Sequence, residues 1–327
     1  MNQFQYVRVT TPKAAVAAVT KDNSTVFLAG GTNLIDLMKR EVTVPEKLVD
    51  ITKIPLNTIE KTDKGLRIGA LAKNTAVAEH ELVRKHFPLL SMAINAGASP
   101  QLRNMATVGG NMMQRTRCSY FYDTAMPCNK REAATGCGAI GGYNRMHAIF
   151  GANDQCIAVH PSDMCIAMAA LDAAVTVAGP KGERKILFAD FHRLPGDTPW
   201  KDNTLQPGEL ILSVELPMNN FATNSHYLKV RDRASYAFAL VSVGAALSMN
   251  GSTIQDVRLA MGGVAHKPWR LMETEQFLRG KSATEATFRQ AAELAMKQAK
   301  GYGENDFKLT LAPNTIVEAL KSAAKIA

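Results

Sequence analysis

The chain has 327 residues, of which 46% are hydrophobic and 20% charged, a balance typical of a folded protein and not of a disordered or repetitive one. Its net charge of +9 is spread over scattered Lys and Arg residues, without the basic motifs of nucleic-acid-binding proteins. We therefore expect no nucleic acid partner. The charge indicates a solvated surface, or one that faces an acidic subunit or an anionic cofactor.

We expect no secretory signal at the N-terminus, because the first residues lack a basic start and the longest apolar run, residues 14–19, is too short. No window approaches the roughly 20 apolar residues of a membrane span. We predict a soluble bacterial protein without membrane insertion. It would be periplasmic if it is exported together with a signal-bearing partner, and cytoplasmic otherwise.

The first part of the chain alternates predicted strands and helices. Residues 26–28 form an apolar run that ends in Gly30-Gly31, as in a buried strand entering a tight turn, and helical spacing follows over residues 34–38. The next predicted elements are strands at 47–51 and 66–71 and a helical region at 75–96 that Pro88 divides.

Hydrophobic periodicity fails from about residue 97 to residue 156, where Gly, Asn, Arg and Cys dominate. A long segment without an apolar face inside a compact domain is usually functional, so we predict an ordered loop. Order resumes with a strand-like run at 156–159 and a helix that Ser162 could cap. A Gly-Pro-Lys-Gly turn at 179–182 then links two strands.

The C-terminal part predicts an antiparallel sheet followed by helices. A surface loop at 194–208 and a change of composition at 217–224 precede it. The predicted strands lie at 227–230, 239–249 and 254–261, with Asn250-Gly251 as a hairpin turn.

A capping box, Ser282-x-x-Glu285, should open the first helix after this sheet, and Gly301 should stop it. The expected fold class is α+β in two domains, residues 1–220 and 221–327.

Two paired-glycine loops could bind phosphate. A strand that ends in Gly30-Gly31 and enters a helix leaves backbone N–H groups facing one space, close to a helix N-terminus. The loop matches neither the dinucleotide-binding nor the nucleotide-triphosphate motif, and a plain strand–helix turn is the alternative. A second loop, Thr107-Val108-Gly109-Gly110-Asn111, raises the odds of a shared phosphate-rich ligand.

Four of the five cysteines fall in one short segment, with the spacing C-x9-C-x8-C-x18-C. This spacing is neither that of a zinc ribbon nor that of a ferredoxin, but four thiolates can converge in space and organise a loop around a metal. Arg115, Arg117, Lys130 and Arg131 surround these thiols and would favour thiolates. From the residues alone, free thiols, zinc and an iron–sulfur cluster all stay open. The four cysteines are Cys118, Cys128, Cys137 and Cys156.

No acid–base catalyst stands out elsewhere. The sequence holds no Ser/His/Asp order, metalloprotease motif or paired carboxylates. His160 lies in His160-Pro161-Ser162-Asp163, but a lone histidine beside a turn is more often structural. Cys165 follows on a predicted buried helix, and we interpret it as a core thiol.

The combination of the loop at 29–33, the loop at 107–111 and Ser162-Asp163 resembles the FAD-binding subunits of the xanthine dehydrogenase/carbon monoxide dehydrogenase family. The resemblance continues in Tyr227-Leu228-Lys229-Val230-Arg231. It implies a flavin domain of the vanillyl-alcohol-oxidase, or PCMH, type in two subdomains, followed by a C-terminal domain of the CO dehydrogenase flavoprotein type.

The resemblance also implies a role for each matched position. The FAD pyrophosphate would lie on the backbone of Leu28, Ala29, Gly30, Gly31, Thr32, Asn33 and Leu34. Thr107, Gly110 and Asn111 would contact the phosphate and ribityl part. Asp163 would accept a hydrogen bond from the ribityl chain or nearby backbone, and Lys229 would lie near the flavin pyrimidine edge.

An insertion at about residues 112–158 separates Asn111 from Ser162 and holds the four clustered cysteines. It is similar to an insertion in the flavoprotein subunits of 4-hydroxybenzoyl-CoA reductase and of bacterial periplasmic aldehyde oxidoreductase, which binds a [4Fe–4S] cluster. The stretches 115–123, 127–131 and 231–239 look most like the aldehyde oxidoreductase. The resemblance therefore implies iron–sulfur rather than zinc.

The function that follows is electron transfer in a heterotrimer. A molybdenum-cofactor-binding large subunit would oxidise the substrate, expected to be an aldehyde, and a [2Fe–2S] small subunit would pass electrons through FAD to an external acceptor. The alternatives are a non-catalytic interaction subunit organised by zinc, a flavoprotein subunit like that of 4-hydroxybenzoyl-CoA reductase, and a stand-alone flavin oxidase.

Overall fold

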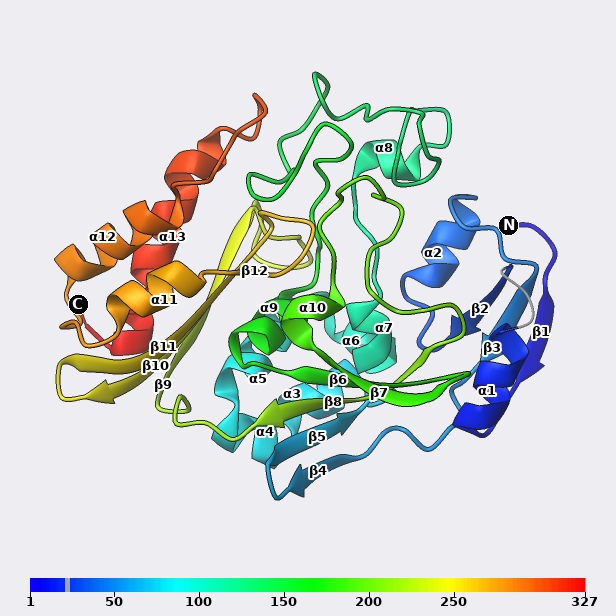
Figure 1. The fold of residues 1–327 in the computed structure, drawn as a ribbon, viewed down its shortest axis with the longest axis horizontal. Coiled ribbons are helices and arrows are strands. Elements are labelled where there is room, and N and C mark those ends of the chain that lie inside the picture. Colours follow the sequence, from blue (N-terminus) through cyan, green and yellow to red (C-terminus); the bar gives the residue numbers. More distant parts are fainter. Residues whose placement is uncertain (21–23, 327) are drawn as a thin grey trace.

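Three sheets and the helices around them make up the chain (Figure 1) in a computed structural model that describes residues 1–20 and 24–326. The N-terminal sheet is parallel, in the order β1-β3-β2, and its strands are connected through helices, as parallel pairing requires. Its elements are β1 (Gln5–Arg8), α1 (Pro12–Val19), β2 (Thr25–Leu28), α2 (Leu34–Lys39) and β3 (Lys47–Asp50).

The second sheet has five antiparallel strands in the order β4-β5-β8-β6-β7. The predicted turn at 179–182 connects β6 to β7, with Gly182 at a φ of 105°. The strands are β4 (Ile59–Thr62), β5 (Gly65–Gly69), β6 (Ala174–Gly179), β7 (Gly182–Leu187) and β8 (Leu210–Pro217).

Helices between β5 and β8 bury their apolar residues in one core with this sheet. Pro88 begins a helix, as predicted, but the region at 75–96 holds three helices because His80 is extended and caps the second through its ring Nδ1. The helices are α3 (Asn74–Glu79), α4 (Glu81–His86), α5 (Pro88–Ala96), α9 (Asp163–Ala170) and α10 (Phe188–Phe191).

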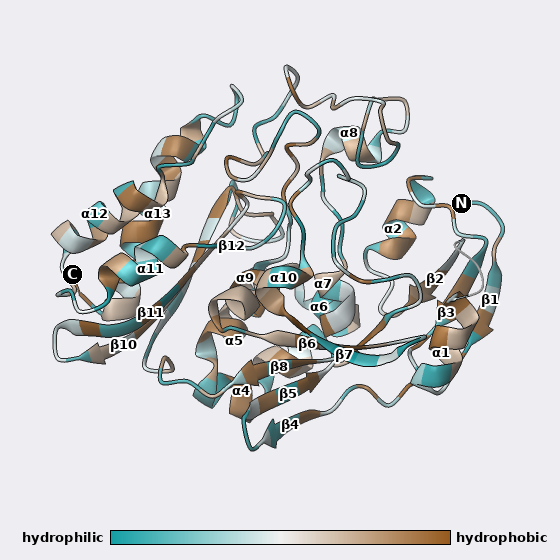
Figure 2. Cartoon of the chain, viewed as in Figure 1, coloured by the Kyte–Doolittle hydropathy of each residue, from teal (hydrophilic) through white to brown (hydrophobic). Residues whose placement is uncertain are grey.

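The third sheet is antiparallel, in the order β12-β11-β10-β9, and confirms the predicted C-terminal sheet and hairpin. Figure 2 shows hydrophobic residues along its strands and the helices packed on it. The elements are β9 (Asn224–Val230), β10 (Val241–Asn250), β11 (Thr253–Gly262), β12 (Trp269–Arg270), α11 (Met272–Leu278), α12 (Glu285–Ala295) and α13 (Phe307–Ala324).

The predicted ends of α12 were wrong at both sides. Its N-cap is Thr284, whose hydroxyl accepts the Thr287 N–H at 3.2 Å, because Ser282 is still extended and bridges to Thr253. The helix also ends at Ala295, well before Gly301.

The segment between α5 and α9 is more helical than predicted at its start and irregular afterwards. Among the described residues, the part from 123 to 162 has no helix or ladder strand, only isolated bridges, and Figure 1 places it with α8 at the top of the view. No helix in the described chain is long and apolar enough to cross a membrane. The helices of this segment are α6 (Pro100–Met105), α7 (Val108–Met112) and α8 (Ser119–Tyr122).

The start of α13 holds the irregular segment against the C-terminal sheet. Lys308 is fully buried, and its ammonium donates to the carbonyl oxygens of His147 at 2.9 Å and Gly263 at 2.7 Å. Burial lowers the pKa of Lys308 to about 7, and the nearby Arg145 acts in the same direction.

Lys308→Met should make stability less dependent on pH. The wild-type lysine has its ordinary pKa of 10.5 when unfolded and about 7 when folded. The unfolded chain therefore binds the extra proton between these values, and wild-type stability falls by up to about 1.4 kcal/mol per pH unit as the pH drops toward 7. The unfolding free energy of wild type minus that of the variant should rise from pH 7 to pH 10 and be flat below. A constant difference in denaturant unfolding would contradict the burial of a titrating lysine.

Candidate functional site

A cleft of about 690 Å³ opens between the start of α2, the helices α6, α7 and α9, and strand β9. This volume is typical of sites for cofactors and small molecules. Six residues that the sequence predicted for FAD line it: Thr32, Asn33, Gly110, Asn111, Asp163 and Lys229. The other six are not among the described lining residues: Leu28, Ala29, Gly30, Gly31, Leu34 and Thr107.

The two glycines of the first loop are required by the chain's own packing. A Cβ on Gly30 would overlap the carbonyl oxygen of Met105, so only glycine lets this loop lie against the segment before α7. Gly31 has a φ of 73°, which side chains rarely adopt. The close approach of backbone to backbone brings Thr32 and Asn33 to the rim of the cleft.

Thr107 has a structural role. Its hydroxyl caps α7 by accepting the Gly110 N–H at 3.2 Å, and the residue is buried. The capping bond accounts for the threonine hydroxyl before the glycine pair, whether or not a ligand is bound. Gly110 and Asn111, which follow in α7, line the cleft.

The side chain of Asn111 is held in one orientation. Its Oδ1 accepts from the Ser162 hydroxyl at 2.5 Å and from Gln114 Nε2 at 2.8 Å. Ser162 also caps α9, as predicted, by accepting the Cys165 N–H at 3.1 Å. With the amide oxygen occupied, the Nδ2 donor is the polar atom that Asn111 can offer to a ligand.

Asp163 and Lys229 form a buried ion pair on the wall of the cleft. Lys229 Nζ donates to Asp163 Oδ2 at 2.8 Å and to the Ala96 carbonyl at 3.0 Å, and the lysine side chain is only 4% exposed. Tyr227 donates to the other Asp163 oxygen at 2.7 Å. Lys229 is therefore not a solvated strand residue. Burial, with Asp163 beside it, raises the pKa of Tyr227 well above its usual value, so the phenol keeps its proton.

The cleft also offers buried polar atoms that no described residue satisfies. Asn33 Nδ2 and Asn74 Oδ1 are buried, belong to lining residues and have no hydrogen-bond partner in the described chain. Buried polar groups are nearly always satisfied in folded proteins, so orphan atoms on a cleft wall fit a polar ligand such as FAD.

Arg117 is a lining residue that sequence reasoning assigned only to the thiols. It faces the cleft, its guanidinium lies 5.2 Å from the ring of Phe238, and burial lowers its pKa. Its place next to Cys118 in the chain joins the cleft wall to the cysteine segment. The sequence could not reveal the contact between Arg117 and the Phe238 ring, because the two residues are far apart in it.

All four clustered cysteines line one small cavity, together with His147 and Lys130. Residues 128 and 137 form an isolated β-bridge, and the five cysteines of the chain are free thiols. A hydrogen bond from Cys156 lowers the pKa of Cys137 to about 6, whereas burial raises the pKa of Cys118 to about 11. No three of the four sulfurs lie mutually within 4.8 Å in the described chain.

Basic residues near the thiols act partly through the backbone. Lys130 is buried, donates to the Pro199 carbonyl at 2.9 Å, and shares Asp202 with Arg115. Burial opposes ionisation of Asp202, but these two cations hold its pKa well below the usual range. Arg131 instead donates to backbone carbonyls at residues 120 and 121, which orders the loop.

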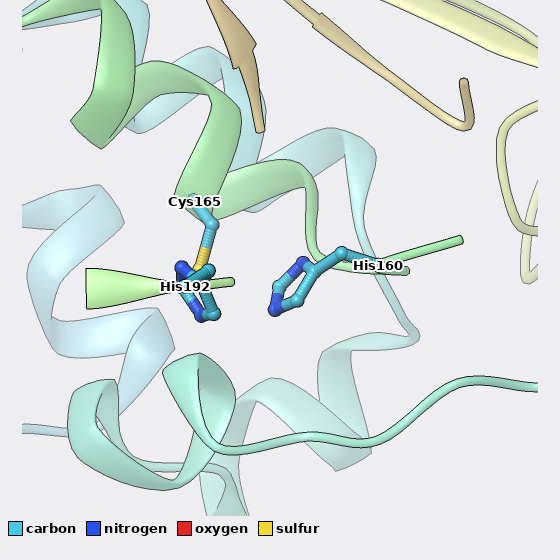
Figure 3. A group of neighbouring side chains, drawn as sticks. All are labelled: His160, Cys165 and His192. Atoms are coloured by element: carbon cyan, nitrogen blue, oxygen red, sulfur yellow. The ribbon is translucent and has the colours of Figure 1, made fainter. Parts of the chain in front are cut away.

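A second group of possible ligands, His160, Cys165 and His192, is buried, and the three side chains lie close together (Figure 3). His160 Nδ1 accepts the Ser162 N–H at 3.3 Å, so the proton of its neutral ring is on Nε2 and that nitrogen cannot bind a metal. Burial also raises the pKa of Cys165 to about 12, which keeps it a thiol. These observations favour the predicted structural role of both residues.

Lys229→Met should cost about 3–5 kcal/mol of unfolding free energy, because it leaves the Asp163 carboxylate buried without its cation. Combining it with Asp163→Asn should restore part of the loss, since the amide can still accept from Tyr227. Denaturant unfolding of the two variants measures both effects. A single variant as stable as wild type would show that the ion pair does not form.

Two family models match successive parts of the chain. Residues 2–219 match the family model "FAD binding domain in molybdopterin dehydrogenase", and residues 226–323 match "CO dehydrogenase flavoprotein C-terminal domain". The chain is 49% identical to the aldehyde oxidoreductase FAD-binding subunit PaoB of Escherichia coli (strain K12), over 99% of both chains. It is 28% identical to the glyceraldehyde dehydrogenase medium chain of Sulfolobus acidocaldarius, over 85% of this chain and 82% of that one.

A solved structure shares the fold. Reconstituted CO dehydrogenase from Oligotropha carboxidovorans superposes with a TM-score of 0.78 over 100% of this chain and 99% of that chain, at 23% identity. The expected α+β architecture, a PCMH-type FAD-binding domain followed by a CO dehydrogenase flavoprotein C-terminal domain, is confirmed. The chain belongs to the FAD-binding subunits of the molybdenum hydroxylase family and is a subunit of an oxidoreductase.

Proposed function

We propose that the chain binds FAD in the cleft and one [4Fe–4S] cluster on its four clustered cysteines, and that it transfers electrons. They would come from a [2Fe–2S] small subunit and leave for an external acceptor. Oxidation of the substrate, an aldehyde, would take place on a molybdenum-cofactor-binding large subunit of the same heterotrimer. We choose an aldehyde as the substrate class because a relative that is 49% identical to the chain is named as an aldehyde oxidoreductase subunit.

When bound, FAD supplies the exchange between one-electron and two-electron transfer. The chain's own residues would bind and orient it. The pyrophosphate would lie beside residues 28–34 and Gly110, with Asn111 Nδ2 as a donor. Asp163 and Lys229 would face the ribityl and pyrimidine side. An ammonium has three N–H donors, and Lys229 uses two within the protein, which leaves one for a ligand.

The cluster proposal is supported by the convergence of all four cysteines on one cavity, which Lys130 also lines. A group bound by four thiolates needs this convergence, and a buried cation beside the sulfurs favours their ionised form. Cys165, which is buried in the core around α9, would not be a ligand.

The proposed domain organisation keeps residues 1–220 as the FAD-binding domain, with the cluster insertion at about 112–158, and residues 221–327 as the C-terminal domain. The chain would be periplasmic if it is exported together with a partner that carries an export signal, and cytoplasmic otherwise. Visible absorption of the purified chain tests the two cofactors together. Flavin bands with a broad iron–sulfur shoulder are expected, and a colourless protein that contains zinc would overturn the proposal.

Gly30→Val should abolish retention of FAD. The new side chain cannot fit against the Met105 carbonyl, so the loop must move away from the cleft. Gly244→Ala is the matched control, because a Cβ there meets only ordinary contacts at 3.7 Å, from side chains of the core. Flavin content per folded chain is the measurement. Full occupancy in a folded Gly30→Val variant would remove the loop from the FAD site.

Single changes to Ser at Cys118, Cys128, Cys137 and Cys156 should each lower the iron content and destabilise the loop. Cys165→Ser should leave iron unchanged, because this thiol lies in the core around α9. Iron analysis and thermal unfolding of the five variants give both readouts. If Cys165→Ser loses iron while one of the other four keeps it, the ligand set is wrong.

A further inference from the structure

We propose that His147 donates a hydrogen bond to the sulfur of Cys118 and thereby raises the reduction potential of the cluster proposed above. The inference rests on that proposed cluster. His147 would be a positioning and tuning residue, not a ligand, because its side chain contacts a cysteine sulfur from outside the set of four.

The contact is direct and buried. His147 Nε2 lies 3.1 Å from Cys118 Sγ, and the histidine is only 4% exposed. A neutral imidazole carries one N–H, which can point at a sulfur acceptor. Both residues line the cysteine cavity, and both also line a small pocket that shares Arg117, Met146 and Asp163 with the FAD cleft.

The position of that single proton follows from the chemistry of Cys118. A cysteine that ligates iron has lost its S–H proton and can only accept a hydrogen bond. The ring proton must then lie on Nε2. The opposite tautomer would face a thiolate with a lone pair.

Hydrogen bonds from the C-terminal part of the chain to the backbone of His147 fix its position. The His147 carbonyl oxygen accepts from Lys308 Nζ at 2.9 Å and from Asn305 Nδ2 at 3.3 Å. At the other end of the same turn, Asn144 Nδ2 donates to the Tyr302 carbonyl at 2.7 Å, and the Asn144 N–H donates to Glu304 at 3.0 Å. Residues 302–308 therefore hold both ends of the turn at 144–147.

A hydrogen bond of this kind acts on the potential because reduction adds negative charge to the cluster and its sulfurs. Donors to those sulfurs stabilise the reduced form more than the oxidised one, most strongly where water is excluded. Residues that hydrogen-bond to metal ligands shift the reduction potentials of metal sites in this way in many proteins. The hydrogen bond that the neutral His147 ring adds at Cys118 should therefore be visible as a shift in the midpoint potential.

Isotopically labelled histidine tests the contact without any substitution. In the intact complex, pulsed electron paramagnetic resonance of the reduced cluster should detect a weakly coupled histidine nitrogen and an exchangeable proton. Absence of both signals from a reduced, iron-loaded wild type would overturn the proposal. A wild type without iron would instead overturn the cluster itself, so the two failures are distinguishable.

His147→Phe removes the donor and keeps a ring of similar size, while His147→Gln keeps an N–H donor. Reduction of the cluster in the Phe variant should become about tenfold less favourable at a fixed potential, a shift of about 59 mV for one electron. The Gln variant should recover part of it, and His86→Phe, on α4, should not shift the midpoint. An unchanged midpoint in an iron-loaded Phe variant would overturn the role of His147.

Discussion

The contact of two backbones at Gly30 and Met105 is the constraint on which the cofactor site depends. The loop after β2 lies against the segment before α7 so closely that no side chain fits between them. The Met105 carbonyl also accepts from Lys73 at 2.9 Å, which helps to fix its position. This approach brings the loop at 32–33 and the loop at 110–111 to one cleft, although they are far apart in the sequence.

Buried charge holds the remaining walls together. Asp163 and Lys229 join the start of α9 to β9, while Asp202 with its two cations joins the surface loop after α10 to the cysteine segment. Lys308 is buried, and among residues 1–20 and 24–326 its ammonium has two carbonyl oxygens and no carboxylate as partners. Part of the net charge of +9 is therefore internal and structural rather than a basic surface.

Local patterns predicted local structure well. The strand before Gly30, the Ser162 cap and the C-terminal hairpin each depend on neighbours within a few residues, and all three are confirmed. The hairpin turn lies one residue later than predicted, at Gly251-Ser252, because Asn250 still pairs with Thr253. The ion pair of Lys229 could not be predicted, because its partner is 66 positions away and nothing in either residue specifies the other. Thr284 replaced Ser282 as a cap for the same reason, since a distant strand pairs with Ser282. The cluster of cysteines was visible in the spacing, but the histidine beside Cys118 was not.

The central claim is that the chain carries electrons for chemistry performed on another subunit. Anaerobic addition of an aldehyde to the co-purified complex and to the isolated chain, with the flavin absorption followed in both, tests it most directly. The account predicts bleaching of the flavin in the complex and none in the isolated, FAD-loaded chain. Bleaching of the isolated chain by the aldehyde would contradict the account and make the protein a flavin oxidase in its own right.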